Sequence, residues 1–161
     1  MNRRTELLLL QLAVGVASLV PILAGGAGVL WGPEFLGVPV PVPPDLDSHL
    51  RYLSGLLLAI GLGFVACIPR IEEKGARFRL LGAIVLVGGL GRALSLLEVG
   101  LPGLGHRLAL GMELGVTPLL ILWQWRIERG WRLARHAGVE KSQGAAGPSS
   151  DDPLNMASDR M

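Results

Sequence analysis

The chain has 161 residues, of which half are apolar and only 17% are charged, and its mean hydropathy is +0.49. This composition argues against an ordinary soluble domain and makes a lipid bilayer the expected solvent. The Lys and Arg residues behind the net charge of +2 lie at the ends of apolar segments, which argues against a nucleic-acid partner. The single cysteine, Cys67, excludes an intramolecular disulfide, a paired-cysteine redox motif and a four-cysteine zinc site.

Four segments are apolar enough to cross a bilayer, since a helix needs about 20 mostly apolar residues to cross about 30 Å of hydrocarbon. They predict membrane spans at about residues 7–30, 50–68, 78–97 and 106–125. The alternative for the first segment is a cleaved signal peptide, because Arg3 and Arg4 precede it and the sequence AGGAG offers small residues for cleavage. Its uncharged run is longer than the usual apolar region of about 7–15 residues, which favours a retained span.

The basic residues predict the orientation, because short loops rich in Lys and Arg stay in the cytoplasm. Eleven lie on the side of the two termini: Arg3, Arg4, Arg70, Lys74, Arg77, Arg79, Arg126, Arg129, Arg132, Arg135 and Lys141. Two, Arg51 and Arg107, lie on the other side. The prediction is an all-α, integral membrane, antiparallel four-helix bundle in the inner (plasma) membrane, with both termini cytoplasmic.

The connections complete this organisation. The proline-rich segment 31–47 predicts an irregular external loop. Residues 1–136 form the bundle with a basic juxtamembrane segment, whose Trp and Arg side chains suit anionic headgroups. Residues 137–161 have few apolar side chains to bury and predict a disordered cytoplasmic tail.

Polar residues in the third and fourth spans predict a site. Arg92 lies five residues before the outer end of one span, and Glu113 lies five residues after the start of the next, so both are about 7–8 Å below the outer boundary. Charges within a span are costly unless paired, so we expect an ion pair between Arg92 and Glu113. The open alternatives are that Arg92 extends to the headgroups, or that the pair only ties two helices together.

A ligand pocket in the outer leaflet is the functional interpretation of these residues. It would be built from Arg51, Arg92, Ser95 and Glu113, with Ser48 and Thr117 beside them. The small residues Gly88, Gly89, Gly111 and Gly115 predict close helix packing, either within the monomer or in a dimer. His49 and His106 lack the spacing of a metal site, so no metal or other cofactor is expected, and no nucleophile and base are suitably spaced.

Several blocks carry a family resemblance: LDSHLRYLSGLLLAIGLG, PRIE, GGLGRALSLLEVGLP, and a glutamate followed by PLLILWQWR. Together, from about Leu7 to Arg126, they resemble the bacterial membrane proteins of domain-of-unknown-function family 4345. The resemblance implies a four-helix membrane bundle and no activity. It directs attention to Ser48, Arg51, Gly55, Gly88, Gly89, Arg92, Ser95, Gly100 and Glu113. In size and span count the chain is also similar to DoxX-type four-helix proteins, some of which associate with quinone-linked oxidoreductases.

Three functions follow from the sequence as hypotheses. The first is binding of a lipid or small amphipathic molecule in the outer pocket. The second is a structural or accessory subunit, which uses Gly111 and Gly115 against a protein partner or a second copy. The third is a membrane enzyme on a lipid-like substrate with Glu113 as general acid or base, although no catalytic motif supports it.

Overall fold

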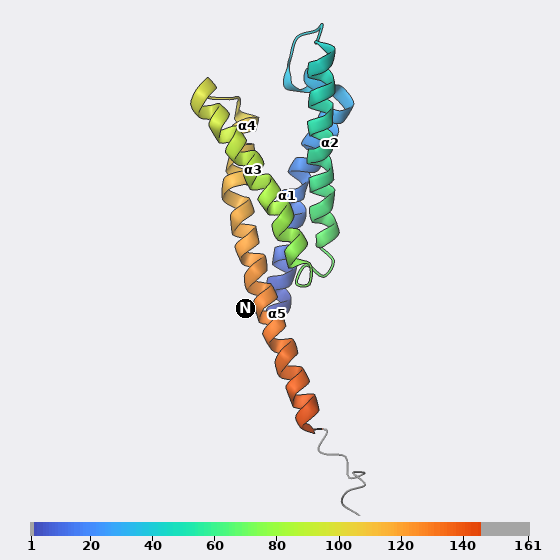
Figure 1. The fold of residues 1–161 in the computed structure, drawn as a ribbon, viewed down its shortest axis with the longest axis vertical. Helices are drawn as coiled ribbons and strands as arrows, with labels where there is room; N and C mark the ends of the chain where they lie inside the picture. Colours follow the sequence, from blue (N-terminus) through green and yellow to red (C-terminus); the bar gives the residue numbers. More distant parts are fainter. Residues whose placement is uncertain (1, 146–161) are drawn as a thin grey trace, which may run out of the picture. The chain divides into compact units, whose positions relative to one another are not determined.

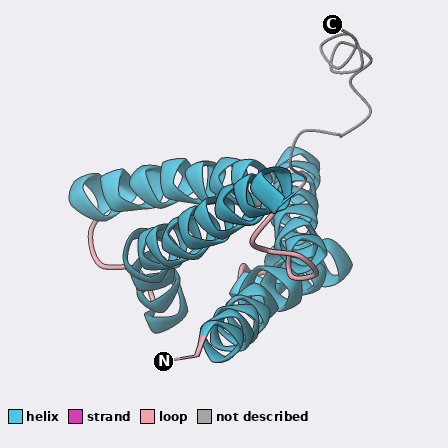
Figure 2. Ribbon diagram, turned by 90° about the horizontal axis from the view of Figure 1, so that it is seen from below, coloured by secondary structure: helices cyan, strands magenta, loops and turns pink. Residues whose placement is uncertain are grey.

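The computed structural model describes residues 2–145, and within them all regular structure is helical (Figures 1 and 2). This confirms the predicted all-α class. The elements in chain order are α1 (Arg3–Trp31), the 3-10 turn η1 (Gly32–Leu36), α2 (Pro44–Cys67), α3 (Gly75–Val99), α4 (Leu104–Gly111), the π-helical turn η2 (Met112–Val116) and α5 (Thr117–Ala145).

Four helical segments are long and apolar enough to cross a membrane, with mean hydropathy between 1.3 and 2.4. They are Arg3–Leu36, Pro44–Cys67, Gly75–Val99 and Leu104–Arg135. At most 17% of the residues in the most apolar window of each segment are buried. Most of their leucine and valine side chains therefore lie on the outside of the protein, where a soluble helix would carry polar residues.

The chain divides into two compact units, Met1–Glu128 and Arg129–Met161. The helix α5 contributes its first residues to unit 1 and continues within unit 2 to Ala145. The predicted tail began at residue 137, and it is helical as far as Ala145 because each residue added to an existing helix gains a hydrogen bond without a new nucleation cost. The rest of that tail, 146–161, lies outside the described residues.

Glycines bring α1 and α2 into close contact within unit 1. A Cβ atom at Gly25 would lie 2.5 Å from the backbone nitrogen of Leu58, and one at Gly61 would lie 2.7 Å from Cγ1 of Ile22. Gly28 gives room to the hydroxyl of Ser54. These contacts advance along α1 as they recede along α2, so the two helices run in opposite directions over most of their length.

A second set of contacts joins α3 to η2 and α5. A Cβ atom at Gly82 would lie 2.5 Å from Cδ1 of Ile121, and one at Gly89 would lie 2.8 Å from Cδ2 of Leu114. Apart from the adjoining backbone of its own helix, no described atom lies within 4 Å of the Cβ position at Gly88, Gly111 or Gly115. Of the four glycines predicted to pack helices together, only Gly89 therefore does so in the described part of the chain.

The two helix pairs share one hydrophobic core, which lies at one end of unit 1. Its buried members come from α1, the end of α2, the α2–α3 loop, α3 and α5: Leu10, Val14, Cys67, Ile71, Phe78 and Ile127. Phe78 also meets Phe64 edge to face, with ring centroids 5.2 Å apart. We call this the core end, and the end with η1 and the α3–α4 turn the open end.

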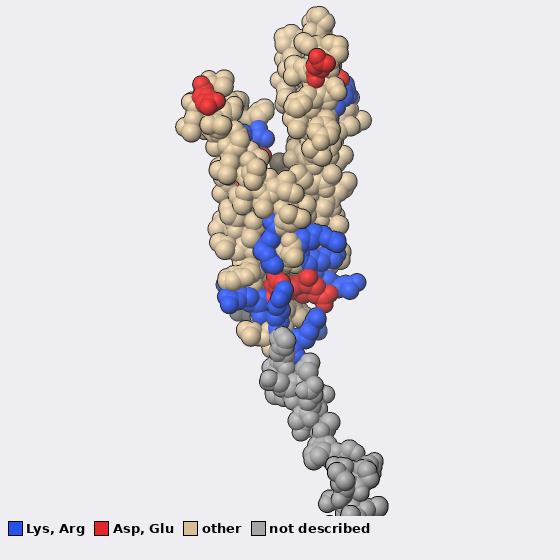
Figure 3. Space-filling model, viewed as in Figure 1, with Lys and Arg blue, Asp and Glu red and all other residues tan. Residues whose placement is uncertain are grey.

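At the open end the two pairs separate (Figure 1). Figure 3 shows a hollow there, with η1 and the start of α2 on one side and the end of α3 and α4 on the other. We call this space the open-end hollow. The four helices thus pack around a common core at the core end only, where large side chains meet.

Candidate binding site at the open end

Arg92 of α3 and Glu113 of η2 are in direct contact. The guanidinium donates from Nε to Oε2 at 3.0 Å and from Nη2 to Oε1 at 3.2 Å. Both side chains are partly buried, with 32% of the Arg92 side chain and 17% of the Glu113 side chain exposed. The two parallel hydrogen bonds of this arrangement fix the guanidinium plane as well as neutralising the charge.

The backbone around Glu113 departs from a regular α-helix. Residues Met112–Val116 form a π-helical turn, in which the backbone N–H of Thr117 donates to the carbonyl of Met112, five residues earlier. The Thr117 hydroxyl donates to the same carbonyl at 3.0 Å. Pro118 follows directly and has no N–H with which to continue an α-helical ladder, which accounts for the position of the irregular turn.

Gly89 allows α3 to approach this turn. A Cβ atom at residue 89 would lie 2.9 Å from Cβ of Glu113, closer than side chains tolerate. Since Arg92 is one helical turn beyond Gly89, the same close approach brings its side chain within reach of the carboxylate.

Arg51 does not join this pair. Its Nε donates to Oδ2 of Asp47 at 2.8 Å, and its Nη1 donates to the carbonyls of Val29 at 2.6 Å and Leu30 at 3.1 Å. Those carbonyls end α1 and have no partner within the helix, so a cation there satisfies them and suits the helix dipole. The Arg51 guanidinium is thus bound to the end of α1 and does not take part in the pocket predicted from the sequence.

The other residues of the predicted pocket are Ser48, Ser95 and Thr117. Ser48 and Ser95 are exposed, and neither makes a hydrogen bond through its side chain to any other described residue. Thr117 lies beside Glu113, but its hydroxyl is engaged with the Met112 carbonyl. Of the six predicted ligand-binding residues, the structure brings Arg92, Glu113 and Thr117 together.

Arg92 retains unused hydrogen-bonding capacity. Its contacts with Glu113 use Nε and Nη2, and among residues 2–135, whose side chains the structure describes, its Nη1 has no partner. A third group can therefore hydrogen-bond to Arg92 without breaking the ion pair.

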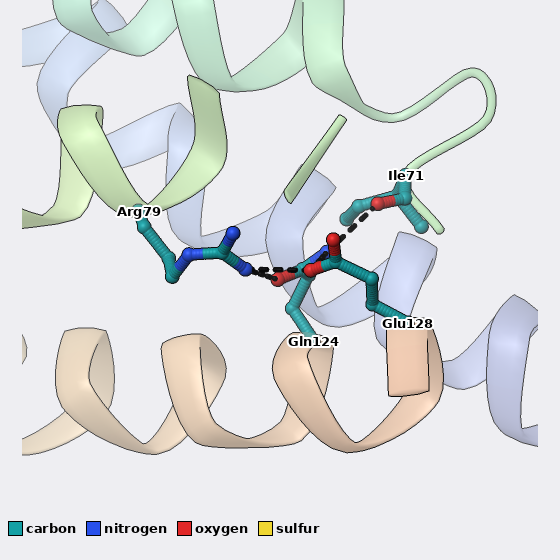
Figure 4. A network of polar contacts seen from close by, with 4 residues as sticks. All are labelled: Ile71, Arg79, Gln124 and Glu128. Atoms are coloured by element: carbon teal, nitrogen blue, oxygen red, sulfur yellow. Dashed lines mark hydrogen bonds and ion pairs between the residues drawn. The ribbon is translucent and has the colours of Figure 1, made fainter. Parts of the chain in front are cut away.

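A second polar cluster, at the core end, was missed by the sequence reasoning (Figure 4). Arg79 donates from Nη1 to Oε2 of Glu128 at 2.5 Å and to Oε1 of Gln124 at 3.5 Å. Gln124 is fully buried and donates to the carbonyl of Ile71 at 3.0 Å. Gly75 makes room for the Glu128 carboxylate, because a Cβ atom there would overlap it.

The same depth argument that pairs Arg92 with Glu113 could have found this cluster. Arg79 and Glu128 lie at comparable distances from the α3–α4 turn on helices that run in opposite directions. The predicted fourth span ended at residue 125, which left Glu128 outside it. The helix in fact continues past that point, and this brings a buried carboxylate opposite Arg79.

The fold defines a class of protein: an all-α protein with four helices long and apolar enough to cross a membrane. A family model described as domain of unknown function (DUF4345) matches residues 9–124. The match covers more than half of the chain, which therefore belongs to this family. The matched range includes Arg92 and Glu113, and Glu128 lies beyond it. No curated protein and no solved structure matches the chain.

Proposed function

We propose that the protein is a multi-pass inner-membrane bundle that binds a lipid or small amphipathic molecule in the open-end hollow, within the outer leaflet. Both termini lie in the cytoplasm in this arrangement. The supporting observation for the orientation is the gathering of Lys and Arg side chains around the core end of unit 1 (Figure 3). Basic residues are retained on the cytoplasmic side of a membrane.

The observation that carries the binding proposal is the geometry of Arg92. It is held in place by Glu113, it is partly exposed, and it has an unused Nη1 donor. Arg92 lies seven residues before the end of α3 at Val99, which is about 10 Å along the helix axis. A donor at that depth meets the polar head of a molecule whose apolar chain lies among the leucines of the helices.

The charges of the pair indicate the kind of head group. Arg92 and Glu113 neutralise each other, so a second anion placed at Nη1 would be repelled by the nearby carboxylate in a medium of low dielectric constant. A neutral acceptor avoids that repulsion. An ester or amide carbonyl of a lipid-like molecule therefore suits Arg92 better than a free anion would.

Native mass spectrometry of gently purified protein tests this proposal. We expect the wild-type protein to retain a lipid-like molecule, and Arg92→Gln to lower the retained fraction about tenfold, as expected for loss of a hydrogen bond to a charged donor. Arg107→Gln is the matched control, since it makes the same charge change at an exposed position of α4 and leaves retention unchanged. Retention that is absent in the wild type, or equal in both variants, contradicts the proposal.

The second candidate is a subunit of a larger membrane complex. It is favoured by Gly111 and Gly115, whose Cβ positions face open space and so leave a small-residue surface for a neighbouring helix. The same experiment separates the two functions. A protein partner in fixed stoichiometry, with no small molecule retained, supports the subunit.

A further inference from the structure

The π-helical turn at Met112–Val116 bears directly on the geometry of the candidate site, because Glu113 lies within it. A π-helical turn has one more residue than the α-helical turn that it replaces, and such turns are frequent at functional sites. One extra residue rotates the preceding part of the helix by about 100° relative to an unbroken helix. The direction in which Glu113 projects therefore depends on the turn.

Because of where Arg92 lies on α3, this rotation determines whether Glu113 can reach it. The line of close contact on α3 passes through Gly75, Gly82 and Gly89. Arg92 is three residues beyond Gly89 and so lies about 60° to one side of that line. Glu113 must project to the same side of the contact to meet the guanidinium, and a rotation of about 100° would carry it away.

The rest of the helix cannot compensate by rotating. Gln124 and Glu128 of α5 are held in the buried cluster with Arg79 at the core end, and Ile121 contacts Gly82. Loss of the π-helical turn would therefore be taken up by η2 and α4, which precede these anchored residues of α5. No residue of α4 is buried.

Thr117 and Pro118 hold the turn in its π form. The Met112 carbonyl accepts both the backbone N–H and the hydroxyl of Thr117. Pro118 removes the N–H that would otherwise bond the carbonyl of Leu114, and its ring would clash with that carbonyl in a regular helix. Each residue disfavours the unbroken α-helix for a separate reason.

We infer that Thr117 and Pro118 are positioning residues of the open-end site, which direct Glu113 at Arg92 through the π-helical turn. This assigns Thr117 a different role from the ligand contact that its sequence position predicts. The inference rests on the proposed function only in taking this site to bind a lipid-like molecule. The geometry of the ion pair is independent of any ligand.

The test measures the accessibility of Arg92 to an arginine-specific dicarbonyl reagent, phenylglyoxal, in delipidated protein in detergent. The exposed Arg107 on α4 serves as the internal reference. Glu113→Gln removes the partner, and we expect it to raise labelling of Arg92 relative to Arg107 severalfold. The double variant Thr117→Val with Pro118→Ala should match that increase. Thr117→Ser, which keeps the hydroxyl, should label like the wild type.

Unchanged labelling in the double variant, beside an increase in Glu113→Gln, overturns the inference. Equal labelling in Glu113→Gln and the wild type also overturns it, because the ion pair then does not shield Arg92. Thr117→Val alone provides a milder version if the double variant loses helical circular dichroism. Ligand retention is measured separately, so a protein that shows the labelling pattern but retains no small molecule contradicts only the proposed function.

Discussion

Two arginine–carboxylate pairs connect α3 with the following helical segment, and their surroundings differ. In the core-end pair the Glu128 side chain is 5% exposed and Gln124 completes its surroundings with a further hydrogen bond. In the open-end pair the Glu113 side chain is 17% exposed, and no other described side chain bonds to Arg92 or Glu113. The core-end carboxylate is thus buried and receives a second protein hydrogen bond, whereas the open-end carboxylate is bound by Arg92 alone among the described residues.

The contact between Arg92 and Glu113 predicts non-additive effects of substitution. Arg92→Leu or Glu113→Gln alone leaves one partner without its hydrogen bonds and should lower the free energy of unfolding by about 1–3 kcal/mol. The double variant should lose less than the sum of the two, because no charge remains unpaired. Thermal unfolding of the four proteins in one mild detergent measures this, and additive losses would show that the two side chains do not interact.

At the level of elements, α1 and α2 are packed through glycine rather than through interlocking large side chains. Gly25 and Gly28 lie on the face of α1 that meets α2, where backbone and hydroxyl atoms approach too closely for any side chain. Gly26 is adjacent in sequence, yet apart from the adjoining backbone of α1 no described atom lies within 4 Å of its Cβ position. Because a helix turns by about 100° per residue, neighbouring glycines face different surroundings.

This difference predicts opposite effects of the same substitution. Gly25→Ala should destabilise the protein by about 1–3 kcal/mol, since the new methyl group meets the backbone of Leu58. Gly26→Ala should be neutral or stabilising by up to about 1 kcal/mol through helix propensity. Thermal unfolding of the two variants side by side is the measurement. Equal destabilisation by both variants would show that Gly25 is not in closer contact with α2 than Gly26 is.

At the scale of the whole molecule, charge and hydropathy together determine the expected relation to a bilayer. Within unit 1, the core end carries Arg3, Arg4, Arg70, Lys74, Arg77, Arg79 and Arg126. Several of these have partners, such as Arg126, which contacts Glu6 at 3.0 Å. A basic end, and an α1 that carries no charged residue after Glu6, are typical of a protein inserted with its core end in the cytoplasm.

Cysteine labelling in spheroplasts tests that orientation with little background, because the single native cysteine, Cys67, is buried. Val40→Cys places an exposed thiol in the loop at the open end, and Ala76→Cys places one at the start of α3 at the core end. A membrane-impermeant maleimide should label Val40→Cys in intact spheroplasts and Ala76→Cys only after lysis. The reverse pattern would show the opposite orientation.

Much of the candidate site could be anticipated from residue positions alone. The placement of Arg92 and Glu113 at equal depths on successive spans required only the rise per residue and the cost of an unpaired charge. The role of Arg51 could not be anticipated, because the carbonyls that it caps belong to a helix more than 20 residues earlier. The exposure of Gly111 and Gly115 could not be anticipated either, because it depends on which helix faces meet.

The sequence by itself determined the all-α class and the four long apolar helices, because run length and composition are local properties that need no partner. Only the tertiary structure decided that the helices share a core at one end alone, that Glu128 and Gln124 bind Arg79, and that a π-helical turn carries Glu113. These features depend on which surfaces approach one another, and periodicity along one helix carries no information about that approach.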